Sequence, residues 1–324
     1  MTDHQAIESD PIMLIFDKAP FPSCHASTVV EVGGGRLLAA WFGGKEEGAA
    51  DVKIWQSSFD GKKWSPPAVV GEEPGFPCWN PVLFRSRANT LFLFYKAGPS
   101  PMTWTGFVRR SADDGKTWGR VEALPAGLLG PIKNKPIEPK PGVILAGTSV
   151  ESHRAWCAWL ERSTNDGKTW RRYGPIAVPD RPHGLIQPTL LQTSDDRILA
   201  LCRSSGIGAI CQAESKDGGE TWSAAGPIEL PNPDSGIDAV RTAKGEFFLV
   251  YNHTKIGRSP LNLARSRDDG KTWRQVATLE SQPGEFSYPA IIQAGDGLLH
   301  ITYTWNRRHI KYVTYDPAKL RETP

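Results

Sequence analysis

The sequence lacks the features of several large protein classes. None of its apolar runs reaches the roughly 18 residues that a membrane-spanning helix needs. The net charge is only +3, which argues against binding to nucleic acid through bulk charge. The five cysteines show no CxxC or Cys/His spacing, so we expect buried reduced thiols and no metal or cofactor.

The N-terminal residues MTDHQAIESDPIMLIF also lack the basic start and long apolar stretch of a signal peptide. This absence predicts a cytoplasmic protein, or a secreted or periplasmic one if a signal has been removed. We expect one domain over residues 1–324, in which residues 1–12 form a flexible extension. No amphipathic helix of three turns is evident.

Turn residues and tryptophan are abundant, with 32 Gly, 27 Pro and 12 Trp. Five segments match one template, and the Trp residues that end them are 54, 52, 52 and 51 positions apart. The Asp-Gly or Gly-Gly pair in each predicts a tight hairpin turn, because glycine readily takes a positive φ. The five segments are SSFDGKKW (57–64), SADDGKTW (111–118), STNDGKTW (163–170), SKDGGETW (215–222) and SRDDGKTW (266–273).

Each repeat period contains four short β patterns, which is typical of a propeller blade. In the fourth period these are 185–193, 197–204, 209–215 and 221–229. The length and the period together predict an all-β propeller of about six blades, each with four antiparallel strands. The sixth blade, 286–316, has only three strand patterns, and residues 13–17 could supply the fourth and close the ring.

The first strand of each blade lines the central axis of a propeller, so the site is expected there. Each of these strands places a polar or ionisable residue before Pro or Ala, at gaps of 55, 55, 52, 51 and 50. The six residues differ chemically, whereas a purely structural position would repeat one type. They are His25, Asn80, Lys135, Gln187, Asp238 and Tyr288.

Loops between the second and third strands form a second ring on the same face. Acidic residues, Glu47 and Asp51 among them, cluster in the loop of the first blade, and arginines dominate in blades 4 to 6. That polarity fits an anionic substrate held by Arg forks, with an acid/base carboxylate opposite. The other loop candidates are Trp104, Arg203, His253, Arg258 and Arg307.

The S-x-D-x-G-x-T-W hairpin is the Asp-box, and a six-bladed propeller with such boxes resembles the sialidase (neuraminidase) superfamily. The chain is similar to its divergent Asp-box, or BNR repeat, branch. The resemblance implies that Arg203 and Arg258 match the second and third arginines that hold the substrate carboxylate. It implies Tyr288 as the nucleophile, and Asp51 or Glu47 as the acid/base.

Two positions depart from the family pattern. The first arginine of the family falls at Cys24 or His25 in the segment FPSCHAST. The Glu that activates the tyrosine falls at Gln187, and an amide cannot accept a proton. The sequence offers Asp238 or His253 as substitutes for that base.

Three hypotheses follow for the function. The first is an exo-glycosidase that removes a terminal acidic sugar, sialic acid or a related ulosonic or uronic acid, from an oligosaccharide or glycoconjugate. The second is a lyase that acts on a uronic-acid glycan, with Tyr288 or a histidine as base or acid. The third is a non-catalytic propeller that binds glycans.

Overall fold

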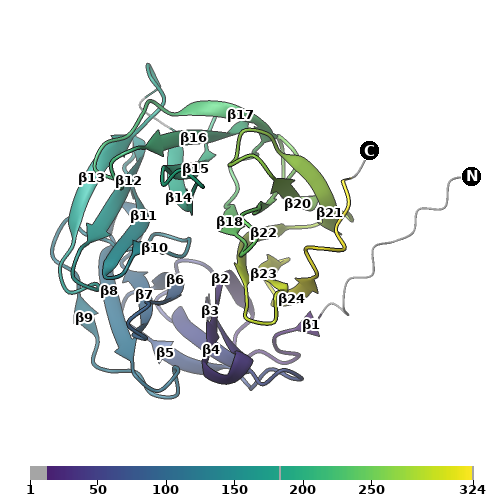
Figure 1. Ribbon diagram of the computed structural model, residues 1–324. Coiled ribbons are helices and arrows are strands. Elements are labelled where there is room, and N and C mark those ends of the chain that lie inside the picture. The colour runs from purple at the N-terminus through teal and green to yellow at the C-terminus, as the bar shows by residue number, and fades with distance from the viewer. Residues whose placement is uncertain (1–12, 182–183, 323–324) are drawn as a thin grey trace, which may run out of the picture.

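The computed structural model describes residues 13–181 and 184–322, and shows six four-stranded antiparallel sheets arranged as a ring (Figure 1). The predicted all-β six-bladed propeller is therefore confirmed. The extension predicted for residues 1–12 lies outside the described residues. In each sheet the first strand is innermost and the later strands follow outwards.

The blades follow one another along the chain. Blade 1 contains β2 (Ser23–Val32), β3 (Arg36–Gly44), β4 (Lys53–Phe59) and β5 (Ala68–Gly71). Blade 2 contains β6 (Cys78–Arg85), β7 (Leu91–Ala97), β8 (Thr105–Ser111) and β9 (Glu122–Ala123). Blade 3 contains β10 (Ile137–Lys140), β11 (Val143–Glu151), β12 (Trp156–Ser163) and β13 (Arg171–Ile176).

The second half of the ring repeats this order. Blade 4 contains β14 (Leu185–Gln192), β15 (Ile198–Ser204), β16 (Ala209–Ser215) and β17 (Gly226–Pro231). Blade 5 contains β18 (Asp238–Arg241), β19 (Phe247–Tyr251), β20 (Leu261–Ser266) and β21 (Arg274–Glu280). Blade 6 contains β22 (Phe286–Gln293), β23 (Leu299–Trp305), β24 (His309–Tyr315) and β1 (Met13–Leu14).

The ring closes through the N-terminal strand, as the sequence predicts. Met13 pairs with Tyr312 and Leu14 with Lys311, so β1 becomes the outer strand of blade 6. The strand spans only two residues instead of the expected 13–17, although the Ile15 N–H still donates to the Ile310 carbonyl at 2.9 Å. This pairing covers an edge of β24 that would otherwise be open.

Two details differ from the sequence pattern. The fourth strand of blade 4 begins at Gly226 instead of 221, because Trp222 still belongs to the turn and its indole N–H donates to the Gly219 carbonyl. The helices in the described residues are short 3₁₀ segments, η1 (Gly33–Gly35) and η2 (Pro101–Thr103). None of the helices found in residues 13–181 and 184–322 could cross a membrane.

Apolar side chains fill the spaces between neighbouring blades. The second strands of four blades each bury at least one large aromatic residue at 0% exposure, among them Trp41, Tyr95, Tyr251 and Tyr303. These side chains belong to clusters that join adjacent sheets, which is how a ring of separate sheets obtains a common core.

The Asp-box hairpin is held by one repeated set of hydrogen bonds. In blade 2, Asp113 accepts bonds from the Thr117 N–H at 2.9 Å and the Thr117 hydroxyl at 2.6 Å. The Ser111 hydroxyl donates to Asp113 at 2.8 Å and accepts from the Gly115 N–H at 2.9 Å. Gly115 has φ +76, and a Cβ there would lie 2.4 Å from Leu38 of blade 1, so the turn packs tightly on the preceding blade.

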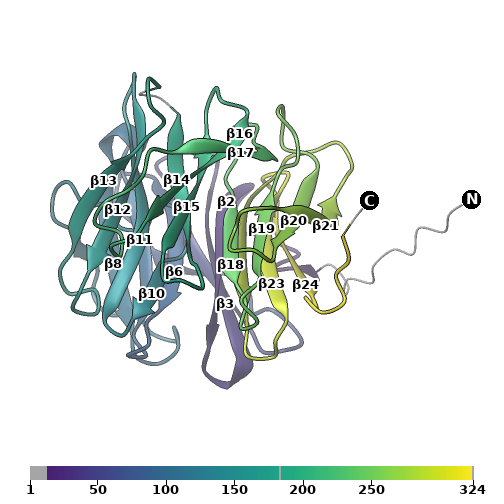
Figure 2. The same ribbon diagram turned by 45° about the horizontal axis from the view of Figure 1, so that its top comes forward.

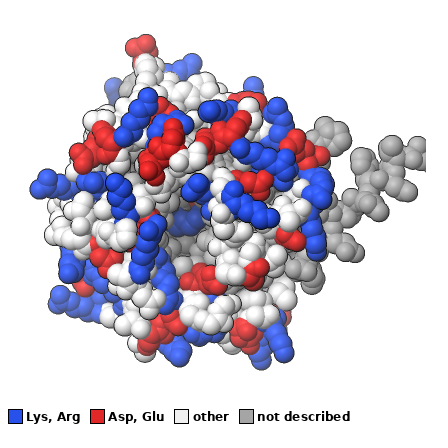
Figure 3. Space-filling model, in the orientation of Figure 1, with Lys and Arg blue, Asp and Glu red and all other residues white. Residues whose placement is uncertain are grey.

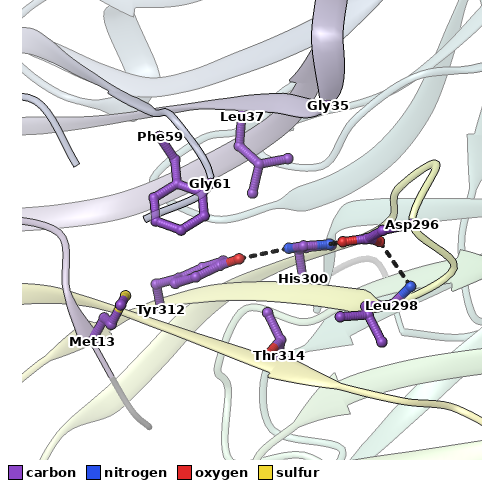
Figure 4. Close-up of a pocket in the computed structure, with 10 residues that line it drawn as sticks. All are labelled: Met13, Gly35, Leu37, Phe59, Gly61, Asp296, Leu298, His300, Tyr312 and Thr314. Atoms are coloured by element: carbon purple, nitrogen blue, oxygen red, sulfur yellow. Dashed lines mark hydrogen bonds and ion pairs between the residues drawn. The ribbon is translucent and has the colours of Figure 1, made fainter. Parts of the chain in front are cut away.

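The hairpin of blade 1 departs from this arrangement. Phe59 occupies the place of the box aspartate, and a Cβ on Gly61 would meet no atom within 4 Å. A cavity of about 290 Å³ therefore remains between blades 1 and 6 on the hairpin face (Figure 4). In its wall, His300 lies between the Tyr312 hydroxyl at 2.7 Å and the Asp296 carboxylate at 3.1 Å.

Candidate active site

A backbone irregularity recurs near the start of the innermost strands, which surround the axis in Figures 1 and 2. Ala26, Asn80, Gln187 and Tyr288 have positive φ values of 57°, 37°, 55° and 50°. At each of them the pairing of the first strand with the second shifts register. These bulges re-aim side chains near the axis.

The bulges correct the predicted alignment of the first strands. In blade 1 the residue with positive φ is Ala26, so His25 lies one position earlier than expected. Asp238 corresponds to a position two residues after the bulge. It accepts a hydrogen bond from the Ile291 N–H of the next blade. Thr189, two residues after the bulge residue Gln187, accepts the Ala239 N–H of the next blade in the same way. Asp238 is therefore equivalent to Thr189 and not to Gln187. The sequence alignment missed this offset because a bulge leaves no sequence signal of its own.

Tyr288 lies at the centre of a basic cluster. Its phenol oxygen accepts a bond from Arg203 Nη1 at 2.8 Å and from Gln187 Nε2 at 3.2 Å. Arg203 is 8% exposed, and its Nε donates to Asp234 at 2.7 Å. Burial opposes the charge of Arg203, but Tyr288 and Asp234 outweigh this effect and raise its pKa. Arg203, Gln187 and Tyr288 thus form one buried contact group.

The orientation of Gln187 follows from its two neighbours. Its Oε1 faces Arg203 Nη1 at 3.5 Å, and an amide turned the other way would point N–H groups at an N–H donor. The Nε2 atom is therefore the one that faces Tyr288. Gln187 occupies the position that the resemblance gives to the activating Glu, and there it donates a hydrogen bond to the phenol oxygen.

Glu285 joins two arginines into a second contact group. It accepts from Arg258 Nη1 at 2.8 Å, and its two oxygens accept from Arg307 Nε at 2.9 and 3.1 Å. Arg307 also pairs with Glu47 of blade 1. The Arg258 guanidinium lies 5.6 Å from the centre of the Tyr288 ring, so the two groups adjoin.

Arg307 lies beside Cys24 and contributes its guanidinium to the site. Cys24 is one of the two positions to which the resemblance assigns the missing first arginine. The Arg307 carbonyl accepts the Cys24 N–H at 2.8 Å. Arg307 and its neighbour Asn306 both have positive φ, which is uncommon outside glycine and turns this segment sharply. A guanidinium from blade 6 therefore lies next to the start of blade 1.

His25 packs against Tyr288, with ring centres 4.1 Å apart, and bonds to the Thr304 hydroxyl at 3.0 Å. Burial, together with the charges of Arg307, Arg258, Arg203 and Lys133, holds the pKa of His25 well below its usual value. His25 is consequently a neutral imidazole.

The two acid/base candidates have different surroundings. Glu47 is joined to Arg307 and so to the cluster around Tyr288. Asp51 is exposed, and its carboxylate accepts the Lys45 N–H at 3.2 and 3.1 Å within its own loop. The structure brings Glu47 to the arginines, and places Asp51 in the turn that supports Glu47.

The remaining candidates lie further from the phenol oxygen. Asp238 is 1% exposed. Its carboxylate accepts hydrogen bonds from Lys135 Nζ at 2.9 Å, from the Thr189 hydroxyl and from the Ile291 N–H, so both of its oxygens have partners. His253 is exposed and bonds to Tyr251. Asn80 is buried at the bulge of blade 2, and Trp104 packs on Trp79 with ring centres 5.6 Å apart.

Three residues of the cluster, Glu285, Asp234 and Lys133, were not among the candidates predicted from the sequence. Glu285 comes three residues before Tyr288, and this spacing could have suggested it. Glu151 in the neighbouring loop has a half-buried carboxyl; burial raises its pKa, and the charge of Arg203 opposes this shift.

Basic side chains also gather at the hollow in the middle of the ring in the view of Figure 3. The described residues contain no group of three or more His, Cys, Asp or Glu side chains placed to hold a metal ion. The chemistry that these side chains offer is recognition of an anion by arginines, beside a tyrosine oxygen and a neutral imidazole.

Comparisons with known proteins agree with the propeller fold. The BNR repeat-like domain matches residues 35–301. A sialidase of Micromonospora viridifaciens is 28% identical over 187 residues, which are 53% of this chain and 27% of that protein. The xyloglucanase Xgh74A of Acetivibrio thermocellus is 28% identical over 232 residues, or 64% of this chain and 25% of that protein. The chain thus spans about a quarter of the length of these relatives.

Solved structures share the fold at low identity. A protein of unknown function from Dyadobacter fermentans superimposes with a TM-score of 0.80 at 19% identity, covering 95% of this chain and 98% of that one. The NanB sialidase of Streptococcus pneumoniae also gives 0.80, at 13% identity, covering 96% of this chain and 71% of that one.

Proposed function

Because this chain belongs to the BNR repeat-like domain family, we propose that it is an exo-glycosidase of sialidase-like type that removes a terminal acidic sugar. The observation that supports this most is the contact of Arg203 with the Tyr288 oxygen at 2.8 Å, beside Arg258 and Arg307. One anion-binding group and one nucleophile are thus adjacent. Sialic acid and related ulosonic or uronic acids are the substrate class.

The substrate carboxylate is bound by arginines. Arg203 and Arg258 provide two arms of the clamp, and Arg307 provides the third in place of the family's first arginine. Glu285 forms ion pairs with both Arg258 and Arg307 and so holds the two guanidinium groups at a fixed spacing. Planar guanidinium groups suit this role because each can donate two parallel bonds to a carboxylate.

In the first step, the Tyr288 oxygen attacks the anomeric carbon and the bond from that carbon to the leaving oxygen breaks. Glu47 supplies a proton to the leaving oxygen, and the phenol proton passes to water because Gln187 and Arg203 only donate. In the second step, water attacks the anomeric carbon, Glu47 takes a proton from it, and the electron pair of the sugar–tyrosine bond returns to Tyr288, whose phenolate regains its proton from water. Tyrosine suits a carbon that bears a carboxylate, because a second carboxylate would be repelled; sialidases are an exception to the two-carboxylate rule.

The test is a screen of sugars released from mixed acidic oligosaccharides by the parent protein and the Tyr288→Phe variant. We expect the variant to lose at least about 10³-fold in turnover, since it removes the nucleophile. Tyr95→Phe is the matched control, because that buried hydroxyl has no hydrogen-bond partner among the described residues. Full turnover by Tyr288→Phe on the true substrate contradicts the proposal.

A lyase acting on a uronic-acid glycan is the second candidate. The neutral His25 packed on Tyr288, and the absence of a carboxylate bonded to the phenol oxygen within the described residues, favour it. There the arginines would neutralise the carboxylate, and Tyr288 or His25 would move the proton next to it. An unsaturated product that absorbs in the ultraviolet distinguishes this reaction from hydrolysis in the same screen.

A further inference from the structure

Lys133 is a buried lysine next to the ring of the proposed nucleophile. Its Nζ donates to Asn134 Oδ1 at 2.9 Å, to the Ile237 carbonyl at 3.0 Å and to the Pro289 carbonyl. An ammonium has three N–H donors, which matches these three acceptors, whereas a neutral amine has only two. The side chain therefore ties the segment before blade 3 to the starts of blades 5 and 6.

The fold makes room for this side chain at Gly236, which comes two positions before Asp238. A Cβ there would lie 3.4 Å from Lys133 Cε and from Tyr288 Cδ2, and 3.3 Å from Gln187 Oε1. Any larger residue would compete with these three side chains for the space between them. Glycine thus lets Lys133 pass close to the tyrosine.

Two relationships connect Lys133 to Tyr288. Lys133 donates a hydrogen bond to the carbonyl of Pro289, the residue that follows Tyr288. The φ of Tyr288 is 50°, which is unfavourable for a residue with a large side chain. The Lys133 Nζ also lies 5.9 Å from the centre of the Tyr288 ring. One side chain thus restrains the backbone of the tyrosine and brings a positive charge to its ring.

The charge next to the nucleophile is opposite to the one that the family resemblance implies. Gln187 replaces the Glu, and the phenol oxygen faces N–H donors from Gln187 and Arg203. Burial lowers the pKa of Lys133 to about 7, and the charge of Asp238 opposes this shift. Below that pH the ammonium form prevails. The other charged or titratable groups that face Lys133 and Tyr288 are Lys135, Arg203, Arg258 and His25.

We propose that Lys133 is a positioning residue for Tyr288: it fixes the left-handed backbone of the tyrosine, and its buried charge favours negative charge on the phenol oxygen. The second role deepens the proposed function, on which it rests, because Tyr288 must act without a neighbouring carboxylate base. The charge supports the phenol oxygen as the electron pair of the sugar–tyrosine bond returns to it.

The experiment compares Lys133→Met with Lys96→Met. Lys96 is a matched control because it is also buried, bonds to the Asn80 and Pro131 carbonyls, and has a pKa lowered by burial to about 7. The packing of Tyr288 is read from near-ultraviolet circular dichroism, as the difference between each protein and the same protein carrying Tyr288→Phe. Lys133→Gln is measured alongside, since it keeps an N–H donor and removes the charge.

We expect Lys133→Met to lose much of the Tyr288 dichroism, because nothing then holds the Pro289 carbonyl, and Lys133→Gln to keep more of it. Below pH 7, where the Lys133 ammonium prevails, we expect both variants to lose about 10-fold in kcat, with KM changed less than about twofold. Lys96→Met should lower the melting temperature without either change. Parent dichroism in Lys133→Met overturns the positioning role, and parent kcat below pH 7 in both Lys133 variants overturns the role of the charge. The dichroism needs no substrate, so failure of the proposed function, seen as turnover by Tyr288→Phe, is a separate result.

Discussion

The Nη1 atom of Arg203 lies 2.8 Å from the phenol oxygen of Tyr288, although 85 residues separate them. Arg203→Lys removes this bond and the Nε bond to Asp234, and leaves a charge without the planar fork. A hydrogen bond to a charged group contributes about 1.5–3 kcal/mol, so kcat/KM should fall by about 10- to 100-fold.

Steady-state kinetics on the released sugar measure this effect, with Arg197→Lys as the control. Arg197 directly precedes the same strand, β15, but pairs with Asp195 and Glu214 instead. Equal kcat/KM values for the two variants would show that Arg203 is only a structural arginine.

Glu285→Gln tests the link between Arg258 and Arg307. The amide keeps the size of the side chain but weakens both ion pairs, so the two guanidinium groups lose their common anchor. We expect KM to rise by about 10-fold with a smaller change in kcat, because the clamp acts in binding. Glu246→Gln, which affects only the exposed Arg267 pair, should leave KM unchanged. A KM that stays at the parent value in Glu285→Gln contradicts the role of Glu285.

The Asp-box aspartates predict a pH dependence of stability. Bonds from the Thr117 hydroxyl and N–H, and then from Ser111, lower the pKa of Asp113 from 3.8 to about 2. A carboxyl whose pKa is lower in the folded state contributes stability above its unfolded pKa, and that stability disappears as the pH falls through about 2. Asp113→Asn copies the natural Asn165 of the blade 3 box. It should flatten the melting temperature between about pH 4 and pH 2, as thermal unfolding at several pH values would show. An unchanged slope would mean that these bonds persist in the unfolded chain.

Two glycines with similar backbones separate strain from packing. Gly219 has φ +93 and Gly61 has φ +96, but a Cβ on Gly219 would lie 2.3 Å from Leu160, whereas one on Gly61 meets nothing within 4 Å. Both alanine variants bear the left-handed strain of about 1–2 kcal/mol. Gly219→Ala should lose a further ~1–3 kcal/mol of unfolding free energy through overpacking. Equal losses in denaturant titrations would show that the packing against blade 3 relaxes freely.

The sequence predicts the ring well because its architecture depends on local signals. The Asp-Gly turns, the spacing of their tryptophans and the alternation of strand patterns each act over a few residues. Closure by residues near Met13 followed from a count of strands in the last blade. The limits of β17 and β1 were less accurate, because the extent of pairing depends on contacts with neighbouring segments.

The sequence predicted the site only at positions where the type of residue is itself informative. Arg203, Gln187 and Tyr288 meet as the strand arrangement suggests. The bulges shift His25 and Asp238 away from their aligned positions, and no residue type announces a bulge. Each of Glu285, Asp234 and Lys133 acts through at least one partner more than 25 residues away in sequence, and such pairs need coordinates.

Much of the candidate site is assembled across the boundary between blade 1 and blade 6, the blade that β1 completes. His25 contacts Thr304 across 279 residues, and Glu47 contacts Arg307 across 260. Each such loop is among the most distant closures this chain can make, and distant closures slow folding. If the two ends of the chain were joined and the chain were cut between residues 47 and 304, these separations would shorten to 45 and 64 residues. The contacts of the candidate site would then form earlier in folding, instead of with the last blade.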